Sequence, residues 1–128
     1  MSTRPDLSKA QMEIMNIVWA RGETTVAEVL EELNKLRKLS RNTVQTMLSR
    51  LDKKGWLKHR RDGKTFYYSA TVSREKTLRR VASDLVDTAF AGSAEGLVLA
   101  LLDGRGLSEG ESSRIRAMIA EAKGGEGE

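Results

Sequence analysis

The sequence predicts a mainly α-helical protein with a small β-hairpin: a winged helix-turn-helix domain followed by a C-terminal helical arm. Three observations predict this fold. Three segments before residue 55 carry apolar residues at helical spacing, each behind a side chain that can cap a helix N-terminus. Residues 56–69 then change to strand-forming residues around an Asp-Gly pair, which is typical of a hairpin. Finally, residues 1–80 hold 18 Lys and Arg against 9 Asp and Glu, whereas residues 81–128 hold 4 against 9.

Length and composition limit the class of protein. A chain of 128 residues with 39% apolar content can hold one domain, or one small domain with an appendage. The absence of Cys excludes disulfides and thiolate metal sites. The N-terminus lacks the apolar segment of a signal peptide, and the longest apolar run, Leu97–Leu102, is too short to span a bilayer. We therefore expect a soluble, cytoplasmic protein without membrane insertion.

The first two helices are predicted from their capping signals. Ser8 is followed three residues later by Gln11, and Thr25 by Glu28, which are two capping-box patterns. Gly22 is expected to end the first helix. Caps account for these residues, although a helix N-terminus that carries hydroxyls can also bind a phosphate. The apolar faces comprise Ala10, Ile14, Ile17 and Val18 in the first helix and Val26, Val29, Leu30 and Leu33 in the second.

The third helix has an unusual polar face. Ser40 is its expected N-cap, and Val44, Met47, Leu48 and Leu51 form its buried stripe. The opposite face carries amides, hydroxyls and arginines, with no acid before Asp52. Such side chains can hydrogen-bond base edges, and phosphate repels none of them. We expect this helix to enter the major groove of DNA through Arg41, Asn42, Thr43, Gln45, Thr46, Ser49 and Arg50.

The hairpin after this helix is the predicted wing. Between Lys35 and Lys64 the chain holds eleven basic and two acidic residues, which indicates a polyanionic partner. Asp62-Gly63 predicts a type I′ turn. Trp19, Trp56, Phe66 and Tyr68 are expected in the core rather than stacked on bases. The predicted backbone contacts are Lys54, Lys58, Arg60, Arg61 and Lys64.

The helices after the wing form the predicted dimerisation region. The assigned boundaries are residues 1–72 for the winged-helix domain, 73–123 for the helical region and 124–128 for a disordered tail. Helices that are apolar on nearly all sides need cover on all sides, and a second copy of the chain would supply it. The alternative is that these helices pack back on their own domain. The predicted dimer contacts are Leu85, Phe90, Leu97, Val98, Leu101, Leu102, Ile115, Met118 and Ile119.

Residues 7–72 also resemble a known family. The resemblance lies in Leu7–Met15 with Val18-Trp19, in Thr43–Leu51 with Lys53-Lys54-Gly55 behind it, and in Phe66-Tyr67-Tyr68. In these segments the chain is similar to the penicillinase-repressor family of winged-helix regulators (BlaI, MecI and the copper-responsive CopY branch). The resemblance implies a homodimer that binds a palindromic operator and represses nearby genes.

The resemblance also implies how repression could be relieved. In the β-lactam branch a membrane sensor-protease system signals release, and the repressor is cleaved at an Asn-Phe bond in its C-terminal arm. The matching pair here is Ala100-Leu101, which departs from that pattern. The copper branch uses a C-terminal cysteine motif, which a chain without Cys cannot form.

The sequence thus predicts a sequence-specific DNA-binding repressor without a cofactor or a metal. The alternative is a winged-helix module that binds proteins and has no specific DNA site. A regulator with a ligand pocket in its arm is a third reading, and few polar residues converge there to support it. His59 is the only histidine, and no nucleophile motif or Gly-rich phosphate loop is present. We therefore do not expect an enzyme.

Overall fold

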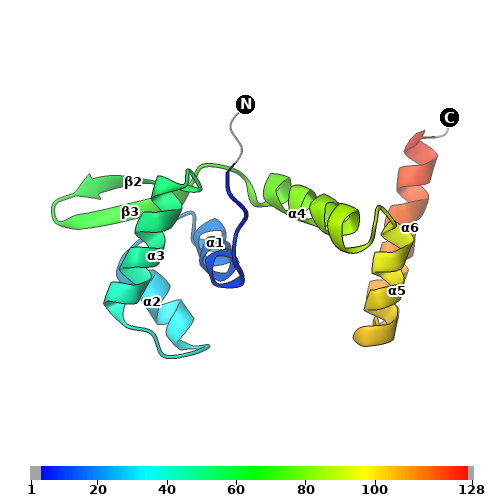
Figure 1. Ribbon diagram of the computed structural model, residues 1–128, viewed down its shortest axis with the longest axis horizontal. Helices are drawn as coiled ribbons and strands as arrows, with labels where there is room; N and C mark the ends of the chain where they lie inside the picture. The colour runs from blue at the N-terminus through cyan, green and yellow to red at the C-terminus, as the bar shows by residue number, and fades with distance from the viewer. Residues whose placement is uncertain (1–3, 127–128) are drawn as a thin grey trace. The chain divides into compact units, whose positions relative to one another are not determined.

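The computed structural model describes residues 4–126, with side chains described as far as residue 123. The chain divides into two compact units, Met1–Arg79 and Arg80–Glu128. The first unit contains α1 (Lys9–Arg21), β1 (Glu23–Thr24), α2 (Val26–Asn34), α3 (Arg41–Lys53), β2 (Leu57–Asp62) and β3 (Thr65–Ala70) (Figure 1). The strands form an antiparallel sheet in the order β1-β3-β2. Three helices with this sheet are a winged helix-turn-helix, so the predicted fold class is confirmed.

Side-chain caps define where the helices begin. Ser8 Oγ accepts from the Gln11 amide at 3.1 Å, and Gln11 Oε1 accepts from the Ser8 amide at 2.9 Å. Thr25 and Glu28 form the same reciprocal pair at the start of α2. Both predicted capping boxes are therefore present, and each satisfies two backbone donors that the helix leaves unpaired. Gly22 ends α1 at a φ of +86°, a conformation that favours glycine.

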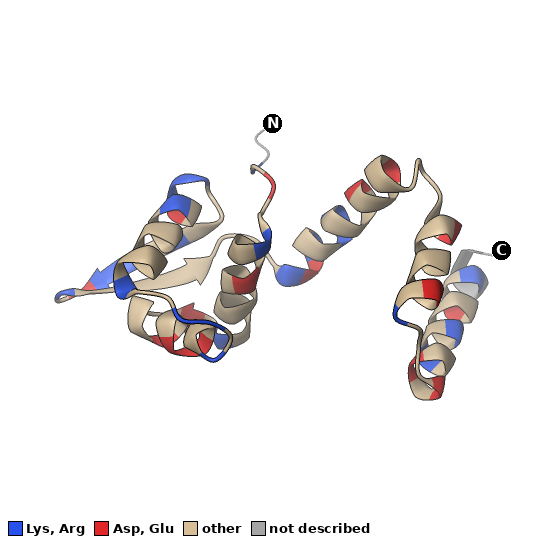
Figure 2. Ribbon diagram, turned by 60° about the horizontal axis from the view of Figure 1, so that its bottom comes forward, with Lys and Arg blue, Asp and Glu red and all other residues tan. Residues whose placement is uncertain are grey.

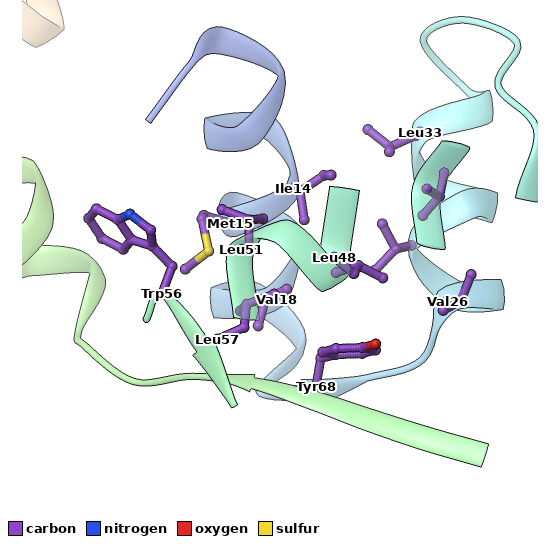
Figure 3. Packing of buried hydrophobic residues seen from close by; sticks show 12 residues of the cluster. Ile14, Met15, Val18, Val26, Leu33, Leu48, Leu51, Trp56, Leu57 and Tyr68 are labelled. Carbon is purple, nitrogen blue, oxygen red and sulfur yellow. The ribbon is translucent and has the colours of Figure 1, made fainter. Parts of the chain in front are cut away.

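The core lies where the three helices meet the base of the sheet (Figure 3). Each element contributes its apolar face, and burial of each large side chain contributes about 1.5–3 kcal/mol. The core fixes α3 so that one face is covered and the opposite face is free. Its residues are Ile14, Met15 and Val18 from α1, Val26, Val29 and Leu33 from α2, Val44, Leu48 and Leu51 from α3, and Trp56, Leu57 and Tyr68 from the hairpin.

The hairpin differs from its prediction in two details. Asp62 is the last residue of β2 and pairs with Thr65, so the loop is Gly63-Lys64. Only Gly63 has a positive φ, at +63°, which is the pattern of a type II′ turn rather than the predicted type I′. The sequence also did not predict β1, because two residues are too few to show alternation.

One of the four aromatic residues that were expected in the core lies outside it. Trp56 and Tyr68 are buried, and Trp19 packs against the core and donates its indole N–H to the Val72 carbonyl at 2.9 Å. Phe66, by contrast, is 40% exposed. It shares the inward-facing register of Tyr68, but it lies two residues nearer the end of the hairpin, beyond the cover of the helices.

Helix α4 (Arg74–Ala89) begins in the first unit. Ser73 caps it, because its Oγ accepts from the Lys76 amide at 3.1 Å. Arg74 Nε donates to Asn16 Oδ1 in α1 at 3.2 Å, and Thr77 is buried. These contacts explain why the compact units divide within α4, whereas the sequence placed a boundary after Val72.

The second unit contains the rest of α4, then α5 (Ala94–Gly104) and α6 (Glu109–Glu126). Gly92-Ser93 interrupts the helix as predicted. No residue of α5 is buried, and all of its residues except Glu95 and Asp103 are apolar or Gly. Helix α6 continues through Gly124-Gly125 to Glu126, so the predicted disordered tail is helical over those residues; residues 127–128 lie outside the described part. A helix already in place extends over glycines at a cost of only about 1 kcal/mol each.

Apolar side chains stay accessible throughout this second unit. Leu85, Val98, Leu101, Leu102, Met118 and Ile119 are between 39% and 64% exposed, while Phe90, Leu97 and Ile115 are half-buried. Among the described residues no single helix is long and apolar enough to cross a membrane; only α4 and α5 taken together, with a 93° bend between them, reach that length and composition.

Candidate nucleic-acid interface

Helix α3 presents the polar face that the sequence predicted. Asn42, Gln45, Thr46 and Ser49 are exposed on it, and the buried side holds Val44, Leu48 and Leu51 (Figure 3). Arg41 and Arg50 flank this face and are also exposed. No acid lies on α3 before Asp52, so the face offers hydrogen-bond donors and acceptors without a negative charge.

The N-terminus of α3 is held by a hydroxyl network. Ser40 Oγ accepts from the Thr43 amide at 3.1 Å and lies 2.9 Å from Thr43 Oγ1. Thr43 was predicted to bind DNA, with a helix position away from the DNA as the alternative. The structure gives its hydroxyl a partner in the cap. Its methyl group and the remaining capacity of the hydroxyl stay exposed.

A groove separates the start of α3 from the wing. Its walls include Arg41 and Gln45 from α3, Thr25 at the start of α2, and Lys64 and Phe66 from the wing. Three of the residues predicted to bind DNA, Arg41, Gln45 and Lys64, are thereby brought together although they lie in different elements. Lys54 lies beyond the opposite end of α3, and Figure 2 shows Lys and Arg in the wing and around both ends of this helix.

The two faces of β2 have different surroundings. On the inward face, His59 Nδ1 contacts Asp52 Oδ2 of α3, and its ring stacks on Phe66 with centroids 4.8 Å apart. Arg61 lies on the same face, 6.0 Å from the Phe66 ring, and its Nε donates to the Gly63 carbonyl at 2.9 Å. The sequence predicted none of these partners for His59, because the Asp52 pairing depends on the tertiary placement of the wing.

On the outward face, Arg60 is already paired. Its Nε and one terminal nitrogen donate to the two carboxylate oxygens of Glu23 at 2.7 and 2.9 Å. This hydrogen bonding lowers the pKa of the Glu23 carboxyl below its ordinary value. Arg60 was predicted to bind phosphate, and its charge is instead compensated within the protein. The basic residues that form no ion pair among the described side chains are Arg41, Arg50, Lys54, Lys58, Arg61 and Lys64.

Nothing in the described residues suggests a metal centre, since no group of three or more His, Cys, Asp or Glu residues is placed to hold an ion. An exposed, acid-free third helix beside a basic hairpin defines a winged-helix domain of the class that transcription regulators use to bind DNA.

Comparison with known proteins identifies the family within that class. Residues 7–121 match the family model described as penicillinase repressor. The penicillinase repressor of Bacillus licheniformis is 30% identical over 123 residues, which cover 96% of each chain. The methicillin resistance regulatory protein MecI of Staphylococcus aureus is 26% identical over 89% of this chain and 93% of its own. The protein belongs to the penicillinase repressor family.

Solved structures agree with the fold of the first unit. The solution structure of the DNA-binding domain of the repressor BlaI is 38% identical, with a TM-score of 0.52 over 58% of this chain and 90% of that chain. The monomeric form of Bacillus licheniformis BlaI in complex with the blaP half-operator is 37% identical, with a TM-score of 0.50 over 59% and 92%. The regulator MarR of E. coli, at 17% identity and a TM-score of 0.56, shares the fold alone.

Proposed function

We propose that this protein is a sequence-specific DNA-binding transcriptional repressor that acts as a homodimer on a palindromic operator. The observation that carries the proposal is the exposed, acid-free face of α3 next to the basic wing. Related repressors of the same family support it, one of them a BlaI monomer in complex with a half-operator. A repressor acts where the chromosome is, so the proposed location is the cytoplasm.

The proposed DNA-binding residues divide into base readers and backbone binders. Asn42 and Gln45 can pair bidentately with adenine, and Arg41 and Arg50 with guanine. Thr43, Thr46 and Ser49 offer hydroxyls to bases or phosphates. Lys54, Lys58, Arg61 and Lys64 supply charge to the phosphate backbone. Arg60 is left out of this set because Glu23 already occupies its guanidinium.

The proposed dimer rests on the second unit. Its exposed apolar side chains, which include Leu101, Leu102 and Val98, form no buried core of their own. Joining two copies would remove that surface from water. A two-fold dimer would also present two copies of α3, as a palindrome requires.

The partner that relieves repression is proposed from the family alone. The family's sensor-protease system cleaves the arm at Asn-Phe, and the matching pair Ala100-Leu101 lies inside helix α5. A protease acting at this bond must first unwind α5, because proteases bind their substrates extended.

Selection of bound sites from random DNA tests this function directly. The expected result is a palindromic motif whose half-sites lie about 34–36 Å apart or a multiple of that distance. A salt titration of the selected site then separates a DNA binder from a protein-interaction module. The affinity of the former falls steeply with salt in proportion to the phosphates contacted, whereas the latter shows weak binding at every salt concentration and enriches no motif.

A further inference from the structure

The ion pair between Arg60 and Glu23 joins two strands that are not neighbours in the sheet. Arg60 lies in β2 and Glu23 in β1, and β3 runs between them. The guanidinium crosses β3 above its direct cross-strand partner Tyr67, with its central carbon 4.5 Å from the ring centroid. Two hydrogen bonds, at 2.7 and 2.9 Å, then complete the bridge to Glu23.

The position of Glu23 gives this bridge its consequence. Glu23 lies between Gly22, which ends α1, and Thr25, which caps α2. Backbone pairing of β1 with β3 extends over only two residue pairs, Glu23 with Ser69 and Thr24 with Tyr68. The Arg60 side chain therefore adds a second connection between the helical part of the domain and the outer strand of the wing.

The neighbouring residue forms a matching connection on the other face of the strand. His59 contacts Asp52 near the end of α3, and successive residues of a strand point to opposite faces. Two adjacent side chains thus fix β2 to two different elements, α3 on the inward side and β1 on the outward side. The hairpin that carries Lys58, Arg61 and Lys64 is therefore held in place by side chains that are themselves paired with acids.

We propose that Arg60 and Glu23 form a positioning pair, which orients the wing relative to helix α3 so that the unpaired basic residues of the wing meet the DNA backbone. Arg60 itself binds no phosphate in this arrangement. The proposal rests on the DNA-binding function proposed above, and it assigns Glu23, an acidic residue, a role that favours binding to a polyanion.

Glu23→Gln separates this role from simple electrostatics, because the two predict opposite signs. Removing a negative charge near DNA should tighten binding if Arg60 is an ordinary cation that Glu23 partly neutralises. Disruption of the positioning pair should instead weaken binding to the selected operator by about two- to five-fold, the range that exposed ion pairs give. Asp62→Asn is the matched control: it removes a negative charge from the same strand at a residue that forms no ion pair among the described side chains.

The salt dependence of Arg60→Ala supplies a second measurement. Arg60→Ala should weaken binding and leave the slope of log affinity against log salt unchanged, whereas Lys64→Ala should lower that slope by about 0.9, the value for one phosphate. Thermal unfolding of each variant establishes that the domain is folded. Binding by Glu23→Gln that equals or exceeds the wild type, or a slope for Arg60→Ala that falls as for Lys64→Ala, overturns the positioning role. Failure of the proposed function would be seen separately, as a wild-type protein without salt-dependent, sequence-selective binding.

Discussion

Arg41, the first residue of helix α3, and Lys64, in the turn of the wing, line the same groove. They come from parts of the chain joined by the whole of α3 and β2, and neither forms an ion pair among the described side chains. The helix and the wing therefore present one continuous basic surface. An arginine can form paired hydrogen bonds to guanine, whereas a lysine acts as a point charge toward phosphate.

Lys64→Ala is expected to weaken binding about equally for the selected operator and for random DNA. Its proposed partner is phosphate, which carries no sequence information. The slope of log affinity against log salt should fall by about 0.9, as expected when the protein neutralises one phosphate fewer. Fluorescence anisotropy over a range of salt concentrations measures it. Lys123→Ala, at an exposed lysine of α6, is the matched control and should leave the slope unchanged. An unaltered slope for Lys64→Ala would remove the wing turn from the set of backbone binders.

Asn42→Ala combined with Gln45→Ala should abolish the preference for the operator and leave binding to random DNA nearly intact. Both amides are exposed on α3, so their removal opens no cavity and the melting temperature should change little. Removal of each bidentate base pairing should cost about 1–3 kcal/mol of discrimination. Competition between operator and random duplexes at fixed salt gives that number. Sequence preference equal to the wild type would show that another face of the domain reads the bases.

The parts of this fold that the sequence predicted are those governed by local chemistry. Ser8, Thr25 and Ser40 each begin a helix because a hydroxyl three residues before an amide can satisfy it, and this requires no knowledge of tertiary structure. The polar face of α3 follows equally from helical periodicity. Strand β1 could not be predicted, because two residues carry no pattern and this strand exists only through pairing with β3.

The wing residues show where such prediction ends. Lys58, Arg60, Arg61 and Lys64 are all basic residues of one hairpin, and composition alone does not distinguish them. Their surroundings do: Arg60 reaches Glu23 across the sheet, while Lys64 lines the groove beside α3. Phe66 was expected in the core for a similar reason, because alternation gives the face of a strand and not the distance along it that the helices cover.

Ser40→Ala should destabilise the first unit by about 1 kcal/mol, within the range of about 0.5–2 kcal/mol for removal of an N-cap hydroxyl. Ser40 Oγ accepts from the Thr43 amide and also lies against the Thr43 hydroxyl, so the variant leaves both groups without that partner. Chemical denaturation followed by circular dichroism measures the change. Ser40→Asp restores an acceptor at the cap and should recover most of the stability. A Ser40→Ala variant as stable as the wild type would mean that solvent satisfies this helix end equally well.

Glu28 should make the stability of the protein sensitive to acid. Its carboxylate accepts from the Thr25 amide and the Thr24 hydroxyl and pairs with Arg21, and these interactions lower its pKa below the ordinary value of 4.5. Because the folded-state pKa is the lower one, the contribution to stability is present above the ordinary value and is lost as pH falls through the folded-state pKa. Glu28→Gln should therefore lower stability at neutral pH and reduce its loss between about pH 5 and pH 2.5.

The matched control for Glu28 is Glu31→Gln, at an exposed acid of the same helix that forms no ion pair or hydrogen bond among the described side chains. Glu31→Gln should leave the pH dependence of the denaturation midpoint close to that of the wild type. Identical acid dependence in Glu28→Gln and the wild type would show that the capping carboxylate does not contribute to acid unfolding.

Leu101→Arg should separate the proposed dimer into monomers. Leu101 is 39% exposed in α5, beside other accessible apolar side chains of the second unit. An arginine there would place an unpaired charge in an apolar interface, and the dimer dissociation constant should rise by roughly 10- to 100-fold. Sedimentation velocity over a range of protein concentrations measures this constant. Leu36→Arg makes the same chemical change at a leucine that is 66% exposed in the first unit, and it should leave the association state unchanged. If Leu101→Arg also leaves it unchanged, the copies join through a surface other than α5. If both variants dissociate the dimer, the first unit contributes to the interface as well.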